Sequence, residues 1–382
     1  MIVLVFGIRV RTRATSTSHG MDFTIIKKDS ATGARLGRLV TAHGVVETPA
    51  FMPVGTQGSV KAMSPRDLEE IGCQLVLANT YHLYLRPGVE VIRDLGGLHR
   101  FMGWTRPILT DSGGYQVFSL GALRKITEEG VHFQSHLDGS SHLLSPEKVA
   151  QIQEDLGSDI AMVLDECIPH PASREYTRLS TERTVRWAER SLKAHTRSDQ
   201  ALFGIIQGGM YQDLRFECVR EMIPFPFDGF AVGGLGVGEE EETLNAIGAF
   251  TAGLLPEERP RYLMGVGRPE DLILAVRRGY DLFDCVLPSR NARRGTLFSS
   301  KGKISIKRAE FSRDSRPIDE SCDCYCCRHF SRAYLRHLYL AGEILAAQLH
   351  TLHNLCFYHQ LMEKLRIAIR EDRAGVEPTI DF

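Results

Sequence analysis

Eight short apolar runs, separated by longer segments with helical periodicity, most constrain the fold of this 382-residue chain. Short, β-rich runs of this kind are typical of strands buried on both faces of a parallel sheet. Eight strand–helix units predict α/β architecture closed into a (β/α)8 TIM barrel. The runs are Pro49–Val54, Gln74–Ala78, Pro107–Leu109, Ile160–Leu164, Leu202–Ile206, Gly229–Val232, Tyr262–Val266 and Leu282–Val286.

Amphipathic patterns at helical spacing lie between these runs. They predict helices at Ser145–Leu156, Arg183–Thr196, Gln212–Met222 and Pro269–Arg278. An open, doubly wound sheet is the alternative fold. However, no Gly-x-Gly-x-x-Gly turn, as found in dinucleotide-binding sheets of that kind, follows the first run. The barrel is therefore the preferred interpretation.

The pattern changes after residue 290, where a basic, loop-like stretch leads to a cysteine cluster. Helical patterns follow at Ser331–Ala347 and Leu352–Arg370. We expect a barrel over residues 21–290, and over 291–382 a zinc-binding subdomain with C-terminal helices packed on the barrel. Residues 1–20 are expected to be a disordered or mis-assigned leader, because Met21 opens a segment that reads like a domain start.

Three cysteines and one histidine have the spacing of a metal site. Cys322, Cys324 and Cys327, followed by His353, supply three thiolates and an imidazole. Zn2+ binds such a set tetrahedrally, without an open position for water, so one structural zinc ion per chain is predicted. Nine cysteines without a signal peptide indicate a reduced cytosolic protein more than a disulfide framework. Two choices stay open: Cys326 in place of Cys327, and His350 in place of His353.

The net charge of −1 says nothing about nucleic acid, but one stretch is basic. Residues 277–336 contain 14 Lys and Arg against 7 Asp and Glu. This excess is either a solvated face compensated elsewhere or a phosphate-binding surface, and charge alone does not decide. No run of 18 apolar residues occurs, so we expect no membrane span and a cytoplasmic location.

Polar residues cluster where the apolar runs end. Asp111, Asp165 and Asp284 follow three different runs, and the strand ends of a barrel converge on one mouth. A pair of carboxylates can cleave a glycosidic bond, one as the nucleophile and the other as the proton carrier. These residue types fit a sugar hydrolase and a nucleoside glycosyltransferase equally well.

Gln207 and the Gly-Gly pairs favour the nucleoside glycosyltransferase over the sugar hydrolase. A carboxamide, a carboxylate and exposed backbone N–H groups complement the edge of a guanine-like ring, and Tyr115 could stack on its face. Taken singly, Gln207 is also typical of a satisfied strand-end amide, and Tyr115 of an aromatic at a rim.

Seven strings and the Cys/His set resemble the tRNA-guanine (queuine) transglycosylases, and the resemblance runs from about Met21 to the C-terminus. Each string is weak alone, but together they are highly specific. The strings are Asn79-Thr80-Tyr81-His82-Leu83, Thr110-Asp111-Ser112-Gly113-Gly114-Tyr115-Gln116, Ser135-His136-Leu137-Asp138-Gly139, Asp165-Glu166-Cys167, Gln207-Gly208-Gly209, Gly233-Gly234-Leu235 and Phe283-Asp284-Cys285-Val286-Leu287-Pro288.

The resemblance implies a role for each site residue. Asp284 matches the nucleophile that attacks the ribose C1′, and Asp111 matches the general acid/base. The positions that match the base pocket are Asp165, Gln207, Gly234 and Leu235 at the base's edge, Tyr115 and Met264 at its two faces, and Tyr262 near the nucleophile. Arg290 and Arg293 match a stretch that contacts tRNA.

Cys167 and Val237 are similar to bacterial members of the family. This implies 7-aminomethyl-7-deazaguanine as the incoming base and the wobble guanine of tRNAs with GUN anticodons as the target. The implied enzyme is a homodimeric glycosyltransferase of queuosine biosynthesis.

Two alternative functions can be compared with the one that the resemblance implies. A metal-dependent barrel hydrolase would need His and carboxylate ligands at the mouth, where only His82 is expected. A non-catalytic RNA-binding subunit of the same family would be expected to lack Asp111 or Asp284, and both are present.

Overall fold

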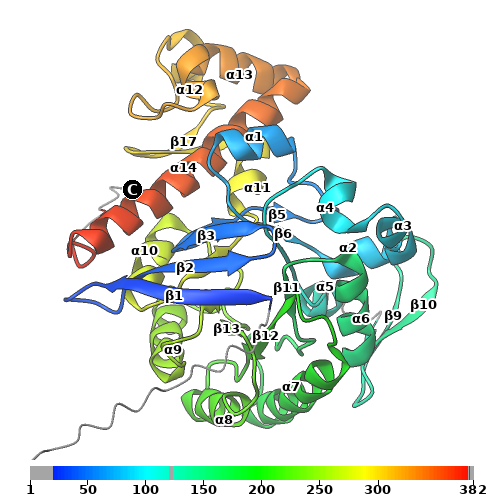
Figure 1. Ribbon diagram of the computed structural model, residues 1–382. Coiled ribbons are helices and arrows are strands. Elements are labelled where there is room, and N and C mark those ends of the chain that lie inside the picture. The colour runs from blue at the N-terminus through cyan, green and yellow to red at the C-terminus, as the bar shows by residue number, and fades with distance from the viewer. Residues whose placement is uncertain (1–19, 120–123, 377, 379–382) are drawn as a thin grey trace, which may run out of the picture.

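The computed structural model describes residues 20–119, 124–376 and 378, and it contains the predicted parallel barrel (Figure 1). Its strands follow the order β4-β15-β14-β13-β12-β11-β7-β6-β5. β4 and β5 are two halves of the first predicted run, so the ring returns to the segment where it started. They are separated by Pro53, which has no N–H to donate. The bounds are β4 (Ala50–Met52), β5 (Val54–Gly55), β6 (Val76–Ala78), β7 (Ile108–Thr110), β11 (Ile160–Met162), β12 (Ala201–Ile206), β13 (Gly229–Val232), β14 (Arg261–Leu263) and β15 (Leu282–Asp284).

Helices surround this ring, as a (β/α)8 barrel requires, and the predicted fold class is confirmed (Figure 1). Nearly all strand residues are buried, because their side chains face either the barrel interior or the helices. The helices of the barrel region are α1 (Pro65–Glu70), α2 (Thr80–Leu85), α3 (Val89–Asp94), α4 (Gly97–Met102), α5 (Gly114–Ser119), α6 (Pro146–Leu156), α7 (Arg174–Ala194), α8 (Gln212–Met222), α9 (Glu241–Leu254) and α10 (Pro269–Arg277).

Helices α6, α8 and α10 are confirmed almost to the residue. Ser145 caps α6 by accepting a hydrogen bond from the Lys148 N–H. The predicted start of α7 at Arg183 is wrong, because the helix begins at Arg174, where Ser173 caps it. Its buried face consists largely of Thr and Ser, so an apolar periodicity cannot reveal its first turns.

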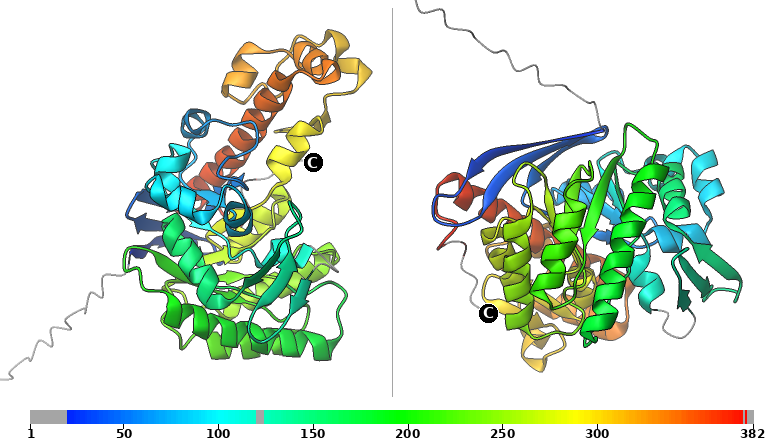
Figure 2. Two further views of the ribbon diagram at one scale, coloured as in Figure 1. Left: turned by 90° about the vertical axis from the view of Figure 1, so that its right-hand side faces the viewer. Right: turned by 90° about the horizontal axis from the view of Figure 1, so that it is seen from below.

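Two three-stranded antiparallel sheets were not among the predicted elements. One comprises β1 (Met21–Lys28), β2 (Arg35–Thr41) and β3 (Gly44–Thr48), and the other β8 (Arg124–Ile126), β9 (Val131–Gln134) and β10 (Ser141–Leu144). In Figure 2 the β1–β3 sheet (blue) lies outside the ring of green helices, beside α14 (Ile344–Arg370, red). The predicted leader, residues 1–20, lies outside the described residues except for Gly20.

The β1–β3 sheet is tied to the N-terminal ends of the barrel strands. The Arg35 guanidinium donates two hydrogen bonds to Asp281, which directly precedes β15. His43, in the β2–β3 turn, hydrogen-bonds to Asp159, which directly precedes β11. The catalytic end of a TIM barrel is the opposite one, so this sheet leaves the mouth open.

The chain after the barrel contains α11 (Leu287–Arg293), β16 (Thr296–Ser299), β17 (Gly302–Ser305), η2 (Ala309–Arg313), α12 (Tyr325–His329), α13 (Arg332–Ala341) and α14. The single helix predicted at Ser331–Ala347 is interrupted, because Gly342 adopts φ 73° and ends α13. The predicted start of the following helix at Leu352 is also wrong, since residues 344–347 already belong to that helix. The next helix, α14, starts at Ile344 and packs on α10, α11 and β4. In the described part of the chain, no helix has both the length and the apolar character to cross a membrane.

We expect Arg35→Ala to destabilise the fold by about 3–5 kcal/mol, because it leaves the buried Asp281 carboxylate without its cationic partner. Arg38→Ala is the matched control, since Arg38 pairs with Glu47 at the surface, where such pairs contribute about 0–1 kcal/mol. Urea unfolding of both variants measures the difference. Equal midpoints would contradict a role for the Arg35–Asp281 pair in holding the sheet.

Candidate active site and metal centre

A cavity of about 580 Å³ lies at the C-terminal mouth of the barrel, where the strand ends converge. It brings together all the predicted residues of the chemistry and the base pocket, although they come from the ends of six different strands. The predicted residues that line it are Asp111, Tyr115, Asp165, Cys167, Gln207, Gly234, Leu235, Tyr262, Met264, Asp284 and Arg290.

Asp111 follows β7 and is buried at the cavity wall. Its Oδ2 accepts a hydrogen bond from Asn79 Nδ2 at 2.5 Å, and its Oδ1 accepts one from the Thr80 N–H at 3.1 Å. Burial raises the pKa of Asp111 to about 7, and the nearby charge of Asp284 adds to the rise, although these hydrogen bonds oppose it. At neutral pH this carboxyl can therefore both give and take a proton.

Asp284 ends β15 on the same cavity. One of its oxygens, Oδ1, accepts hydrogen bonds from the Tyr262 hydroxyl at 2.6 Å and from the Gly265 N–H at 2.8 Å. Within the described residues, no hydrogen bond reaches its second oxygen. Burial raises the pKa of Asp284, and the two donors oppose the rise. Two donors on one oxygen fix the orientation of the carboxylate and leave the other oxygen available to react.

Asp165 and Gln207 lie next to each other in the wall of the cavity. Gln207 Nε2 donates to Asp165 Oδ2 at 2.7 Å, and Ser112 Oγ donates to Oδ1 at 3.1 Å. Gln207 Oε1 is buried and has no partner in the described structure. A Cβ at Gly234 would lie 2.5 Å from this oxygen, so glycine keeps the approach to the amide open. A buried, unpaired acceptor of this kind is suited to an N–H donor of a ligand.

Four other predicted residues complete the walls of the cavity. Tyr115, on α5, has 56 % of its surface exposed at the mouth, and Met264 follows β14 on the cavity wall. Cys167 and Leu235 are buried. The exposed ring of Tyr115 is free to pack against a planar ligand.

Some residues of the site position the carboxylates, and their residue types alone do not indicate this role. Asn79 and Ser112 belong to strings noted in the sequence, yet only the structure shows which oxygen each one contacts. Glu166, directly after Asp165, turns away from the cavity and accepts hydrogen bonds from Tyr176 and Arg183 of α7. Its contacts anchor the loop after β11 to that helix.

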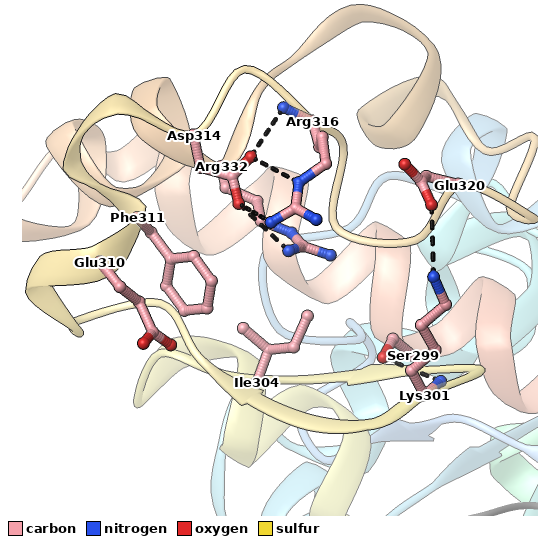
Figure 3. A pocket seen from close by; sticks show the side chains of 9 residues that line it. All are labelled: Ser299, Lys301, Ile304, Glu310, Phe311, Asp314, Arg316, Glu320 and Arg332. Carbon is pink, nitrogen blue, oxygen red and sulfur yellow. Dashed lines mark hydrogen bonds and ion pairs between the residues drawn. The ribbon is translucent and has the colours of Figure 1, made fainter.

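The basic stretch divides into paired and unpaired residues. Figure 3 shows a hollow beside β16 and β17 in which Arg316 and Arg332 both contact Asp314, while Lys301 contacts Glu320. This part of the positive excess is compensated locally, as the solvated-face interpretation predicts.

The arginines of α11 differ from those in the hollow. Arg290 lines the rim of the active-site cavity, and Arg293 lies one turn further along, outside the cavity lining. Neither forms an ion pair within the described residues. Arg293 Nη1 donates to the Ser289 carbonyl oxygen at 2.9 Å. Both arginines are at least partly exposed, so their charge is available to a phosphate.

Cys322, Cys324, Cys327 and His353 form a buried group that could hold a metal ion, with one ligand atom from each within 4.8 Å of the others. His353 Nδ1 lies 3.3–3.8 Å from the three sulfur atoms. Its other nitrogen, Nε2, lies 2.6 Å from the Phe298 carbonyl oxygen, which fixes the tautomer that presents Nδ1. Cys326 and His350, the open alternatives, are buried outside this group.

Comparison with known proteins identifies the family to which the chain is similar. Residues 29–376 match the family model described as queuine tRNA-ribosyltransferase. The queuine tRNA-ribosyltransferase of Thermoanaerobacter sp. (strain X514) is 59% identical over 352 residues, which cover 92% of this chain and 94% of that protein. The one of Solidesulfovibrio magneticus is 60% identical over 342 residues, covering 89% and 92%.

The chain belongs to the queuine tRNA-ribosyltransferase family. The family predicted from the seven strings is thereby confirmed, and with it the class of enzyme, a tRNA-guanine transglycosylase. Among the described residues, the clusters able to hold a metal are the Cys/His group and His43, His99 and Asp159. Neither cluster is part of the cavity lining, which contains the carboxylates Asp111, Asp165 and Asp284.

We expect Cys324→Ala to release the bound metal and to lower the melting temperature, because a structural metal contributes folding free energy directly. Elemental analysis and a thermal melt of the purified chain measure both effects. Cys326→Ala is the control, since that thiol is equally buried but lies outside the ligand group. Full metal occupancy in Cys324→Ala would contradict the ligand assignment.

Proposed function

We propose that this chain replaces the wobble guanine of tRNAs with GUN anticodons by 7-aminomethyl-7-deazaguanine, through a covalent bond between Asp284 and the ribose. The observation that carries the proposal is the pair of carboxylates in one cavity, Asp284 held through one oxygen and Asp111 with a pKa of about 7. Family membership supports tRNA as the polymer.

Asp284 acts as the nucleophile. A carboxylate oxygen forms a bond to C1′ while the bond from C1′ to the guanine nitrogen breaks, and Asp111 gives its proton to the departing base. The incoming base then displaces the carboxylate at the same carbon and returns a proton to Asp111. Two displacements at one centre hold the sugar between the departure of one base and the arrival of the next.

Base recognition is assigned to Asp165, Gln207, Gly234 and Leu235. The Asp165 carboxylate accepts N–H groups of the ring, and the free end of the Gln207 amide, together with backbone groups at Gly234 and Leu235, pairs with the rest of its edge.

The remaining pocket residues enclose the base. Tyr115 and Met264 cover its two faces, Tyr262 orients the nucleophile, and Cys167 closes the pocket beside Asp165. These roles follow the family resemblance and fit the cavity lining.

The metal is assigned as zinc. Three thiols and an imidazole Nδ1 suit Zn2+ in a closed tetrahedral site, which supplies structure and takes no part in the chemistry. A homodimer is also proposed. It is supported by large apolar side chains that are exposed on α13 and at the start of α14: Tyr334, Leu340, Ile344 and Leu345. A cytoplasmic location stays a prediction.

Asp284→Asn is expected to abolish base exchange and the denaturant-resistant tRNA adduct while leaving tRNA binding largely intact, because the amide is isosteric but a poor nucleophile. Denaturing gel electrophoresis of enzyme mixed with tRNA detects the adduct, and exchange of radiolabelled guanine into tRNA reports turnover. A covalent complex that still accumulates in this variant would assign the nucleophile to another residue.

The pKa of about 7 for Asp111 predicts opposite pH dependences for the two half-reactions. Guanine departure needs the protonated acid, so the rate of adduct formation should fall as pH rises through about 7. Capture of the new base needs the carboxylate, so that rate should fall as pH drops through about 7. Single-turnover measurements separate the two, and Asp111→Asn should slow adduct formation ~10²–10⁴-fold and remove the inflection. Parallel profiles would exclude Asp111 as the shared acid and base.

Arg290→Ala should weaken tRNA binding and reduce the slope of log K against log salt by about one, because one unpaired cation at the cavity rim no longer binds a phosphate. Arg316→Ala is the matched control, since Arg316 is paired with Asp314 in the hollow of Figure 3. Filter binding at several salt concentrations gives both slopes. An equal effect of the two substitutions would show that the patch acts only through its total charge.

A further inference from the structure

A fifth donor lies beside the metal group and is not one of its four members. Cys356 is on α14, three residues after His353, so both side chains project from the same face of the helix. It is 6% exposed. Its thiol is a neighbour of the thiols of Cys322 and Cys324.

The fifth donor and the histidine approach the same thiols. His353 Nδ1 lies 3.8 Å from the Cys322 sulfur and 3.6 Å from the Cys324 sulfur, the two sulfurs that Cys356 also contacts. One helix therefore presents two donors, less than one turn apart, to one edge of the site. A four-coordinate ion uses only one of them, and zinc binds sets of four thiolates as well as sets of three thiolates and one imidazole.

Cys326, the other cysteine next to the ligand group, has different surroundings. Cys326 is fully buried on α12, next to Cys327 in the chain, but it forms no hydrogen bond to the four ligands in the described structure. Proximity in sequence thus does not make a thiol a neighbour of the ion. Cys356, 29 residues beyond Cys327, has its thiol beside two of the ligands, whereas Cys326 shows no such side-chain contact.

We propose that Cys356 is a reserve ligand of the metal site. While His353 holds the fourth position, Cys356 stays a thiol beside Cys322 and Cys324 and does not bind the metal. When the imidazole is absent or displaced, the metal–nitrogen bond is lost, a metal–sulfur bond to Cys356 forms, and the thiol proton passes to solvent. The donor set changes from three thiolates and an imidazole to four thiolates. This inference rests on the proposed zinc site.

The test replaces His353 in the full-length chain. His353→Gln removes Nδ1, while its amide can still donate to the Phe298 carbonyl, so the packing of α14 is retained. Zinc per chain is measured after gel filtration, alone and in competition with a chelator. His353→Gln should keep most of its zinc. The additional change Cys356→Ser should weaken zinc binding at least ~10-fold, since even the loss of a residue that only hydrogen-bonds to a ligand costs about 10–100-fold. The double variant His353→Gln/Cys326→Ser is the control and should behave like His353→Gln.

Cobalt substitution reads the donor set directly. The thiolate-to-cobalt absorption per bound Co2+ should be the same in the wild-type chain and in Cys356→Ser, and it should rise in His353→Gln as a fourth thiolate binds. Loss of zinc from His353→Gln as complete as from the Cys356 double variant, or an unchanged cobalt spectrum, would overturn the proposal.

If the His353→Gln chain does not fold, a second measurement tests the proposal without it. Chelators then remove zinc from the wild type, from Cys356→Ser and from Cys326→Ser. The proposal expects faster loss from Cys356→Ser alone, because the ligand that recaptures a partly released ion is missing, and equal rates in all three chains overturn it. A wild-type chain that binds no zinc would instead refute the metal assignment itself, and with it this inference.

Discussion

The closure of the parallel strand ring is the constraint on which the rest of the structure depends. β15 pairs with β4, and β6 pairs with β5, which follows β4 after Pro53. Because every strand runs in the same direction, closure forces all the strand ends that carry polar residues onto one mouth. Asp111 and Asp284, which are 173 positions apart in the chain, therefore share a cavity that no local segment could form.

Within that cavity the two carboxylates have different hydrogen-bond partners and electrostatic surroundings. Both are buried, and burial alone would raise the pKa of each. Asp284 is held through one oxygen by a hydroxyl and a backbone N–H, which favours a fixed, ionised group. Asp111 also feels the negative charge of Asp284, and its pKa reaches about 7. The charge of Asp284 thus helps to keep Asp111 able to exchange a proton, and the proposed assignment of nucleophile and acid rests on the different surroundings of two identical side chains.

The sequence predicted the parts whose signal is local. Eight apolar runs, the Asp residues at their ends and the spacing of three cysteines are visible in short windows, and the structure contains each of them. The start of α7 was not visible, because its buried face is made of Thr and Ser. Neither was the Arg35–Asp281 pair, whose members are 246 residues apart. The position of Cys356 beside the metal group was not predicted either. Ligand spacing is judged along the chain, whereas this position depends on the face of α14 that Cys356 shares with His353.

Helix α14 connects the metal group to the catalytic mouth. His353 lies within it, and the next residue, Asn354, donates hydrogen bonds to the carbonyl oxygens of Pro288, in the first turn of α11, and of Thr296, the first residue of β16. One turn later the Tyr358 hydroxyl donates to the Gly267 carbonyl at 2.6 Å, in the cavity wall after β14. Since α11 carries Arg290 at the rim, an ion bound by His353 would stabilise, through Asn354, the helix that places this cation beside the cavity. A metal site away from the cavity can in this way help to position a charged residue at its rim.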